Sequence, residues 1–373
     1  MKLLVVAGGG GHFAAALSVL QQIPKDWEVL IVGRKYSFEA DKTLSFEYKT
    51  AQNLGLRFES ITTGRLQRKL SFQSLNIFAK MPIGILQAIK VIKNFKPDVV
   101  VSFGGYVSLP ICFIAKSFNI PIIVHEQTFT AGLANKIVSK FAEKICISWE
   151  DSRKYFPKDK VVFTGNPLKK NEGSNSQFNI PDEKLPVIYV TGGSSGAHAI
   201  NVLIEEIIEK LLVEYIVIHQ TGDAKKFGDF DRLSQKKKSL SKDLQKRYAL
   251  IKFIEAGQVF SVLEKADLVI SRSGINSVTE IIHLGKPALF IPLPFGQRNE
   301  QLTNAQFVKK IGLAEIAQQK DLTGDKLLEL IKQMLKNIDL YKNHAIEAKK
   351  FIQKEAAEKI ISVIVHVNQQ KKT

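Results

Sequence analysis

The chain has 373 residues and a formal net charge of +17, with 53 Lys and Arg residues against 36 Asp and Glu residues. Hydrophobic residues make up 45% and charged residues 24% of it, which is typical of a folded globular protein and excludes a disordered or collagen-like chain. Because a single hydrophobic core stops growing at about 250–300 residues, we expect two domains.

The cysteine content and the hydropathy of the chain indicate the compartment in which it functions. The two cysteines, Cys112 and Cys146, are too few for a disulfide framework and indicate a reducing compartment. No apolar run reaches the roughly 18–20 residues of a membrane span, and four glycines interrupt the apolar N-terminus where a signal peptide would continue. The positive charge favours an anionic partner: a nucleic acid, a phosphorylated substrate or a membrane surface.

Short β-rich segments alternate with helical patterns in the first half of the chain, which is typical of parallel βαβ units. Residues 166–185 are polar and contain several Asn, Ser and Pro residues, so we predict a linker there. The predicted strands are Leu3–Ala7, Val29–Gly33, Val99–Phe103, Ile122–His125, Lys144–Ser148 and Val161–Thr164, and the predicted helices include Ala14–Gln22 and Ile83–Asn94.

The second half repeats this organisation. Its start, Ile188–Gly193, matches Leu4–Gly9 at an offset of 184 residues. We therefore predict an α/β protein of two tandem Rossmann-like domains, residues 1–165 and 186–373, whose glycine-rich turns face a shared cleft. The predicted strands of this half are Val187–Thr191, Tyr215–His219, Ala249–Phe253, Leu268–Ser271 and Ala288–Ile291, followed by helical patterns from about Asp325 to Val367.

The first glycine-rich turn, Gly8–Gly11, leads into a helix. Glycines allow close approach to an anion, and the helix start offers N–H groups. The next residue, His12, is a candidate general base, or else it only forms a local hydrogen bond. Gly9, Gly11 and Ala14 also match a dinucleotide fingerprint. Since Arg34 could bind a 2′-phosphate, an NADP-dependent reductase is a second hypothesis.

Three motifs of the second half suit a nucleotide sugar. Gly192–Gly196 repeats the anion-binding pattern and adds hydroxyl groups. In Arg272–Glu280 a glycine turn leads into a helix on which Glu280 could accept hydrogen bonds from ribose, or could simply stabilise the helix start. The amides of the segment Pro292–Ala305 suit sugar hydroxyls, although a polar loop would have the same composition.

Two further segments have competing interpretations. Asp229-Phe230-Asp231 is similar to the Asp-x-Asp that holds a metal in many sugar transferases, but its polar surroundings favour a solvated loop. Residues 65–83 mix apolar side chains with cations, which predicts either contact with an anionic bilayer or a core helix with a basic outer side. The cations are Arg65, Arg68, Lys69 and Lys80.

Taken together, these motifs resemble those of the MurG family, peripheral membrane enzymes that transfer N-acetylglucosamine from UDP-GlcNAc to undecaprenyl-diphospho-muramoyl-pentapeptide in peptidoglycan synthesis. The resemblance implies a GT-B fold and an inverting transfer to the C4 hydroxyl without metal or cofactor, at the cytoplasmic face of the cell membrane. The motifs that carry it are Gly8–His12, Phe103–Ser108, His125–Gln127, Gly165–Pro167, Gly192–Ser194, Arg272–Glu280 and Gln301–Ala305.

The resemblance also implies roles for single residues. His12 would be the base, with His125 in reserve, and Gly9, Gly10 and Gly11 would line the acceptor or diphosphate side. On the donor side the expected contacts are Ser194 to the diphosphate, Ile254 to uracil through its backbone, Glu280 to ribose, Gln301 to the sugar, and the helix start with Ile275, Asn276 and Ser277 to the leaving diphosphate.

Some positions depart from the family's pattern. Thr128 and Lys169 are expected substrate contacts that stand where the family has Asn and Arg, and Ser195 stands where it has Gln. These changes leave open a related glycosyltransferase that uses another lipid acceptor. A nucleic-acid binder is the third alternative, but the chain lacks a familiar nucleic-acid motif.

Overall fold

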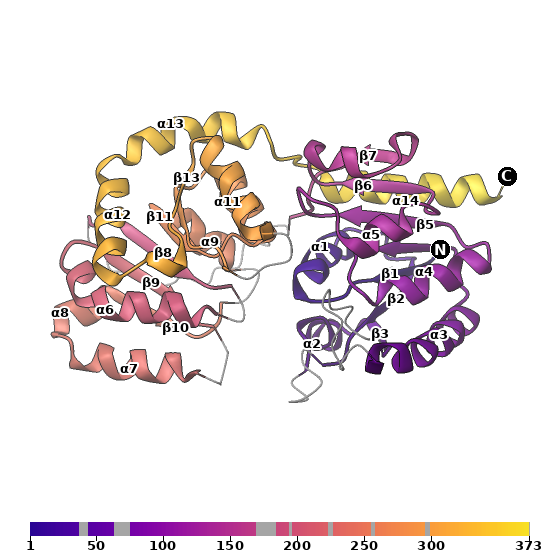
Figure 1. Ribbon diagram of the computed structural model, residues 1–373, viewed down its shortest axis with the longest axis horizontal. Helices are drawn as coiled ribbons and strands as arrows, with labels where there is room; N and C mark the ends of the chain where they lie inside the picture. Colours follow the sequence, from indigo (N-terminus) through magenta and orange to yellow (C-terminus); the bar gives the residue numbers. More distant parts are fainter. Residues whose placement is uncertain are drawn as a thin grey trace. The chain divides into compact units, whose positions relative to one another are not determined.

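The computed structural model describes residues 1–36, 44–62, 75–168, 184–193, 196–222, 227–254, 258–294 and 299–372. The chain forms two compact units, drawn in Figure 1. Unit 1 comprises Met1–Lys169 together with Gln353–Thr373, and unit 2 comprises Lys170–Ile352. Most of the predicted linker 166–185 lies outside the described residues.

Unit 1 is built on a seven-stranded parallel sheet of order β3-β2-β1-β4-β5-β6-β7. Its strands are β1 (Lys2–Val6), β2 (Glu28–Gly33), β3 (Arg57–Ser60), β4 (Val99–Ser102), β5 (Ile122–Glu126), β6 (Lys144–Ile147) and β7 (Val161–Phe163). Its helices are α1 (Gly10–Leu20), α2 (Phe46–Asn53), α3 (Leu75–Phe95), α4 (Ser108–Ser117), α5 (Leu133–Val138) and α14 (Ala356–Lys372), with short 3-10 turns η2 (Glu150–Tyr155) and η3 (Lys158–Lys160).

Both faces of this sheet are buried. Leu4 and Val6 of β1 belong to one apolar cluster, which includes residues of α3 and α4. Leu3 and Val5 point the other way and belong to a second cluster, with residues of α1 and α14. A strand covered on both faces is apolar at every position, which is why the N-terminal run of the chain predicts a strand.

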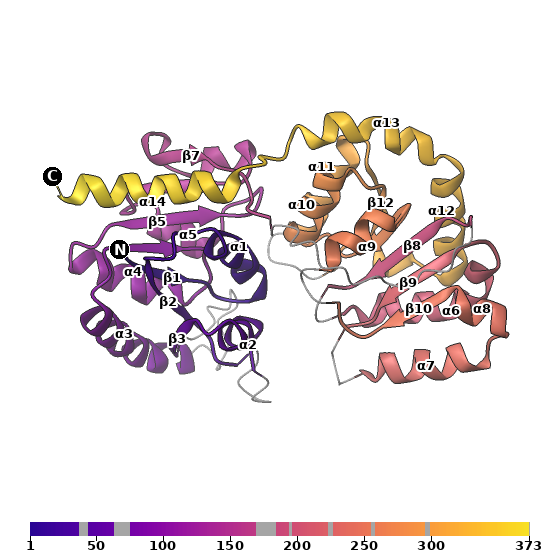
Figure 2. The ribbon, with the colours of Figure 1, turned by 180° about the vertical axis from the view of Figure 1, so that it is seen from behind.

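The last helix belongs to unit 1, and Figure 2 shows α14 lying along this sheet. Its buried side chains Ala357, Ile360, Ile364 and Val367 recur at helical spacing and join the cluster on the α1 side of the sheet. The second domain expected from the sequence ran to residue 373, whereas residues 353–373 pack on the first unit. The reason is this apolar stripe, which packs against α1, β4 and β6.

Unit 2 has a six-stranded parallel sheet of order β10-β9-β8-β11-β12-β13. Its strands are β8 (Val187–Thr191), β9 (Ile216–Gln220), β10 (Tyr248–Ile251), β11 (Leu268–Ser271), β12 (Ala288–Phe290) and β13 (Ala314–Ile316). Its helices are α6 (His198–Glu214), α7 (Asp229–Ser239), α8 (Lys242–Lys246), α9 (Val259–Lys265), α10 (Ile275–Leu284), α11 (Glu300–Lys310), α12 (Gly324–Lys336) and α13 (Ile338–Lys349), with a short 3-10 turn η6 (Gln319–Asp321).

The predicted strands are all present, with ends shifted by at most two residues. The sequence analysis missed β3 and β13, two of the four edge strands, whereas the other two edge strands, β7 and β10, were predicted. The predicted class, two parallel Rossmann-like sheets in tandem, is confirmed. None of the helices within the described ranges combines the length and the apolar character of a membrane span.

Candidate active site

The two sheets share one topological feature. In each, the strand order changes direction between two central strands, β1 and β4 in unit 1 and β8 and β11 in unit 2. Ligands of open parallel sheets bind at such a switch point, beyond the carboxyl ends of the strands. The motifs found in the sequence lie at these ends: Gly8 follows β1, Gly192 follows β8, and Arg272 follows β11.

The unit 1 turn brings two backbones into direct contact. The Gly8 N–H donates to the Gly104 carbonyl over 3.0 Å. A Cβ at Gly105, whose φ is +86°, would lie 2.6 Å from the Gly8 Cα. Gly9 has a φ of +111° and precedes α1, whose first two residues, Gly10 and Gly11, are exposed. The close contact therefore requires glycine at both positions 8 and 105, and the tip of the turn, Gly10 and Gly11, is exposed to solvent.

His12 lies in the first turn of α1 and is half-buried. Its Nδ1 is 3.2 Å from the Gly8 carbonyl oxygen. A carbonyl can only accept, so Nδ1 carries the hydrogen and the lone pair of the neutral ring is on Nε2.

Burial lowers the pKa of His12 below its ordinary value of 6.5, the Glu126 charge and the Gly8 carbonyl raise it, and the Arg34 charge lowers it further. A histidine that is neutral at pH 7 is in the form that can accept a proton.

His125, the reserve base, is completely buried on β5. Its Nε2 is 3.2 Å from the Ser148 hydroxyl and 3.3 Å from the Gly165 carbonyl. Burial lowers its pKa to about 4. An imidazole with no exposed surface does not reach a substrate, which argues against His125 as the base.

A buried carboxylate organises the loop after β5. Glu126 accepts hydrogen bonds from the N–H of Thr128 (3.1 Å), the N–H of Gly132 (2.9 Å) and the side-chain amide of Asn135 (2.9 Å). The hydroxyl of Thr128 lies 2.8 Å from the same carboxylate and also contacts the Thr130 carbonyl. Thr128, an expected substrate contact, thus has its hydroxyl engaged inside this loop.

A second buried acid was missed by the sequence analysis. Glu47 of α2 is 1% exposed, and its Oε1 lies 3.9 Å from the Nε of Arg34. Burial raises the pKa of Glu47, whereas its own backbone, the charge of Arg34 and the backbone of Gly9 lower it. Because this carboxylate faces both Arg34 and the Gly9 backbone, it disfavours binding of a 2′-phosphate there and argues against the NADP hypothesis.

In unit 2 the loop after β8 is equally tight. A Cβ at Gly192 would lie 2.2 Å from the Ala197 nitrogen, and a Cβ at Gly196 would lie 2.0 Å from the Thr221 carbonyl oxygen. The Gly196 N–H donates to the Gly193 carbonyl over 3.0 Å, which closes the turn before α6. Ser194, Ser195 and Lys169, three positions singled out in the sequence, lie outside the described residues.

The turn after β11 is held from within unit 2. The Ser273 hydroxyl donates to the Gln301 carbonyl over 2.7 Å, and the Asn304 amide donates to the Ser273 carbonyl over 2.9 Å. α10 then begins at Ile275, and its N-cap Gly274 has no side chain to satisfy the first N–H groups of the helix. This helix start can therefore receive an anion.

Five of the expected donor contacts lie on the two helices next to this turn, α10 and α11. Asn276, Ser277 and Glu280 are half-buried on the first two turns of α10, and Ile275 is buried. Gln301 is the second residue of α11, and its Oε1 accepts from the Leu293 N–H over 2.9 Å. The structure thus brings α10 and Gln301 together.

Ile254, the expected uracil contact, lies after the edge strand β10, which β9 and β8 separate from β11. Its side chain is buried. Only its backbone could therefore face a base, as the resemblance implies.

Arg272 belongs to the scaffold of this site. Its guanidinium donates to the Ile291 carbonyl over 2.7 Å and to the Gln319 side chain over 2.7 Å. Burial lowers its pKa to about 10, so it still carries a positive charge at neutral pH. Arg272 therefore ties β11 to the chain around β12 and to η6.

The Asp-x-Asp motif is not the solvated loop that the sequence predicts. Asp229 begins α7 and is buried, whereas Asp231 on the same helix is exposed. Within the described residues, no three His, Cys, Asp or Glu side chains come together in a way that could hold a metal ion.

The sequence matches two family models. Residues 3–147 match the glycosyltransferase family 28 N-terminal domain, and residues 187–360 match the family 28 C-terminal domain. These ranges contain the first strands of both sheets and the residues described above around Gly8, Gly192 and α10.

Curated relatives and a solved structure extend the likeness to the whole chain. A Bacillus cereus protein named UDP-N-acetylglucosamine–N-acetylmuramyl-(pentapeptide) pyrophosphoryl-undecaprenol N-acetylglucosamine transferase 2 is 32% identical over 98% of this chain and 99% of its own length. A Treponema denticola protein with the same name, without a number, is 35% identical over 90% of this chain and 88% of its own. The crystal structure of Acinetobacter baumannii MurG superposes with a TM-score of 0.70 at 25% identity and covers 98% of this chain and 100% of that one.

Proposed function

Because the chain belongs to the MurG family within glycosyltransferase family 28, we propose that it transfers N-acetylglucosamine from UDP-GlcNAc to the C4 hydroxyl of undecaprenyl-diphospho-N-acetylmuramoyl-pentapeptide. The observation that carries this proposal is the likeness to a relative of that name, which spans 98% of this chain and 99% of the relative. A match of this extent includes both the acceptor half and the donor half.

We propose that unit 2 binds the donor. The carboxylate of Glu280 suits two ribose hydroxyls, which both donate, and the backbone after β10 at Ile254 suits the edge of uracil. The amide of Gln301 suits the sugar hydroxyls. The start of α10 with Asn276 and Ser277, together with Ser194, would stabilise the diphosphate through N–H groups and hydroxyls.

We propose that unit 1 supplies the acceptor side and the base. The acceptor hydroxyl attacks the anomeric carbon, its proton passes to Nε2 of His12, and the bond from the anomeric carbon to the UDP oxygen breaks. The pair of electrons leaves on the diphosphate, whose growing charge the helix start at Ile275–Ser277 offsets. Attack from the face opposite to UDP inverts the configuration. The turn Gly9–Gly11, of which Gly10 and Gly11 are exposed, would lie against the acceptor diphosphate, with Thr128 and Lys169 as further contacts.

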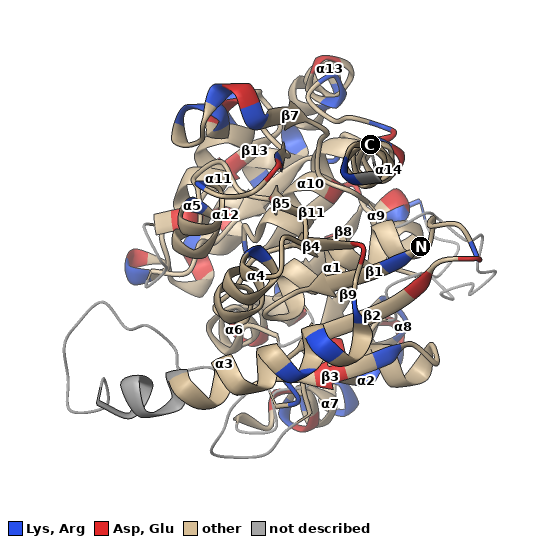
Figure 3. Cartoon of the chain, turned by 90° about the vertical axis from the view of Figure 1, so that its right-hand side faces the viewer, with Lys and Arg blue, Asp and Glu red and all other residues tan. Residues whose placement is uncertain are grey.

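Helix α3 supports a proposal of peripheral attachment to the cytoplasmic face of the membrane. Ile83, Ile85 and Leu86 are 48%, 39% and 67% exposed, whereas the C-terminal half of the helix is anchored in the core by Val91, Ile92 and Phe95. In Figure 3 the ribbon of α3 is blue, for Lys or Arg, near that anchored end, where the sequence has Lys90 and Lys93. Of residues 65–83, only Pro82 and Ile83 have described side chains, so the choice between the two interpretations of that segment stays a prediction. Arg65, Arg68 and Lys69 lie outside the described residues, and Lys80 lies on α3 itself.

A transfer assay tests the proposed reaction. Purified protein is given UDP-GlcNAc with lipid-linked muramoyl-pentapeptide in one arm and with diacylglycerol in another, and the glycosylated lipid is measured. We expect product in the first arm only, and most of the activity to remain in EDTA. Product in the diacylglycerol arm alone would support the related glycosyltransferase, and binding of NADPH but not of UDP-GlcNAc would support the reductase.

A further inference from the structure

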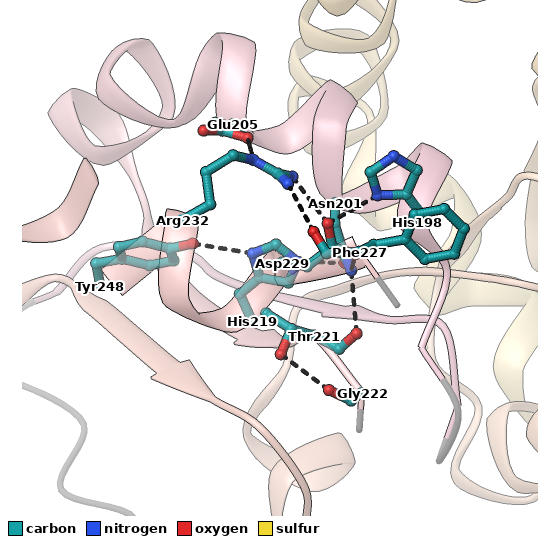
Figure 4. Close-up of polar contacts among 10 residues, drawn as sticks. All are labelled: His198, Asn201, Glu205, His219, Thr221, Gly222, Phe227, Asp229, Arg232 and Tyr248. Carbon is teal, nitrogen blue, oxygen red and sulfur yellow. Dashed lines mark hydrogen bonds and ion pairs between the residues drawn. The ribbon is translucent and has the colours of Figure 1, made fainter. Parts of the chain in front are cut away.

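A network of buried polar side chains lies at the carboxyl ends of β8 and β9, and Figure 4 shows its members. Its centre is the carboxylate of Asp229, which is 7% exposed at the start of α7. One oxygen accepts from Nδ1 of His198 over 2.7 Å and from the guanidinium of Arg232 over 2.9 Å. The other oxygen accepts from the amide of Asn201 over 2.7 Å. This carboxylate therefore joins the first turns of α6 and α7.

The hydrogen-bond pattern leaves Asn201 one orientation. Its Nδ2 donates one hydrogen to Asp229 and the other to the Thr221 carbonyl over 3.0 Å. Its Oδ1 must then accept from Nε2 of His219, which is 3.0 Å away. Nδ1 of His219 consequently accepts from the Tyr248 hydroxyl over 2.9 Å. Burial lowers the pKa of His219 to about 3, against the opposing charge of Asp229, so the ring is neutral and the pattern does not change near neutral pH.

The charged carboxylate of Asp229 connects the other side chains of the network. Burial raises its pKa, but the hydrogen bonds from Asn201, His198 and Arg232 outweigh burial, and the net pKa is below its ordinary value. Arg232 also pairs with Glu205 of α6, which ties the two helices a second time. The carboxylate is thus ionised and paired at neutral pH.

The network reaches the glycine loop through one carbonyl. Thr221, whose carbonyl accepts from Asn201, is the residue on which Gly196 packs, since a Cβ at Gly196 would lie 2.0 Å from that oxygen. His198 follows the loop directly as the first residue of α6 and is stacked on Phe227, with ring centroids 4.1 Å apart and 9° between the planes. Gly196 and the start of α6 are therefore held in place by Asp229 and its partners.

We propose that Asp229 is a positioning residue for the donor's diphosphate. It holds the first turn of α6 and the Thr221 carbonyl in place, and these position Gly196 and Ala197, which connect the glycine turn to α6. It does not touch the nucleotide itself. This inference rests on the proposed function, in which the glycine turn after β8 contacts the donor's diphosphate through Ser194. The motif Asp229-Phe230-Asp231 thus serves this site through a hydrogen-bond network within the chain.

The variant Asp229→Asn tests the proposal, because an amide at this position has one acceptor oxygen in place of two and must turn its NH2 toward Asn201 or toward His198 and Arg232. We expect binding of UDP, measured by calorimetry, to weaken about tenfold. Binding of uridine, measured by ligand-observed NMR, should change less than twofold because uridine has no diphosphate. In the transfer assay the KM for UDP-GlcNAc should rise about tenfold with kcat changed less than threefold.

The chain offers a matched control in Asp231→Asn, an exposed position two residues along the same helix. Its UDP and uridine affinities should equal those of the unchanged protein. The milder variant His198→Ala removes only one partner of Asp229, whose side chain is 37% exposed. This variant tests the proposal if Asp229→Asn does not fold. It should weaken UDP binding about threefold and leave uridine binding unchanged. Thermal unfolding is recorded for all variants.

The outcomes separate the two proposals. An unchanged protein that fails to bind UDP overturns the proposed function itself. If the unchanged protein binds UDP, and the folded variants of Asp229 or His198 bind it with the same affinity, the positioning role alone is overturned. Equal loss of UDP and uridine affinity would show that the network only stabilises the unit, and it would also overturn the proposal. Loss confined to UDP supports it.

Discussion

The first strands of the two units end on closely similar sequences, Ala7-Gly8-Gly9 and Thr191-Gly192-Gly193, yet the side chains around the two turns differ in kind. Near the first turn lie His12 and two buried acids, Glu47 and Glu126. Beside the second lie hydroxyl and amide groups, with one carboxylate, Asp229, that is paired to Arg232 and to His198.

The same backbone thus carries two chemistries. A turn surrounded by titratable groups suits proton transfer, because their charges adjust the pKa of a histidine. A turn surrounded by neutral donors and a balanced ion pair suits a nucleotide whose charge must not be repelled. If the two units have these separate roles, substitutions in unit 1 should change kcat and substitutions in unit 2 should change donor binding.

The largest effect is expected at His12. The substitution His12→Ala removes the base of unit 1 and should lower kcat about a hundredfold or more. The affinity for UDP-GlcNAc, a property of unit 2, should be nearly unchanged in calorimetry. The matched control is His366→Ala, an exposed histidine on α14 of the same unit, which should keep full activity. Turnover of His12→Ala at nearly the normal rate would contradict the assignment of the base.

The pH profile sharpens this assignment. His12 must be neutral to accept a proton, so kcat should fall as the pH drops through its pKa. Because burial lowers that pKa, the acid limb should lie below pH 6.5. The limb should be absent from the residual activity of His12→Ala.

In contrast to His12, Glu280 should affect the binding of UDP-GlcNAc. We expect Glu280→Ala to weaken UDP-GlcNAc binding by about 1.5–3 kcal/mol, the range of a hydrogen bond to a charged group. The exposed Glu264 of α9 provides the control, since Glu264→Ala in the same unit should bind normally. Unchanged binding within error in Glu280→Ala would remove this carboxylate from the donor site.

Alanine substitutions at different glycines of the turn should change the free energy of unfolding by different amounts. Gly105→Ala combines a φ of +86° with a Cβ 2.6 Å from the Gly8 Cα, and it should lower the free energy of unfolding by about 1–3 kcal/mol. Gly11→Ala, where an added Cβ meets nothing within 4 Å, should stay within about 0.5 kcal/mol of the normal value in urea unfolding. Equal losses would mean that crowding at the turn is not the cause.

Exposed apolar side chains occur in both units and allow the smallest effect to be tested. Ile83→Asp with Leu86→Asp on α3 should weaken binding to anionic vesicles about tenfold, because apolar burial in the interface is lost. Leu340→Asp with Ile346→Asp on α13 of unit 2, which are 62% and 74% exposed, should leave it unchanged.

Charge reversal at Arg65, Arg68 and Lys69 should also release the folded protein, at roughly 1 kcal/mol per cation. Retained vesicle binding in both α3-side variants would return this segment to the role of a core helix alone.

The central part of each sheet could be predicted because it is local in sequence. Strands such as β1 and β8 are buried on both faces and therefore form continuous apolar runs. Two of the four edge strands, β3 and β13, were missed for the same physical reason. Arg57–Ser60 is mostly exposed, and Ala314–Ile316 is short and half-buried, so neither has such a run.

The roles of polar residues depended on partners far away in the chain. The sequence alone determined the α/β class, the repeated glycine turns and the candidates His12 and Glu280, since these follow from short motifs at strand ends. Only the tertiary structure decided that His125 is sealed in the core, that Asp229 joins α6 to α7, and that the last helix covers the sheet of unit 1. Burial and hydrogen bonding are set by contacts such as that of Asn201 with Asp229, and no local pattern records which residues folding brings together.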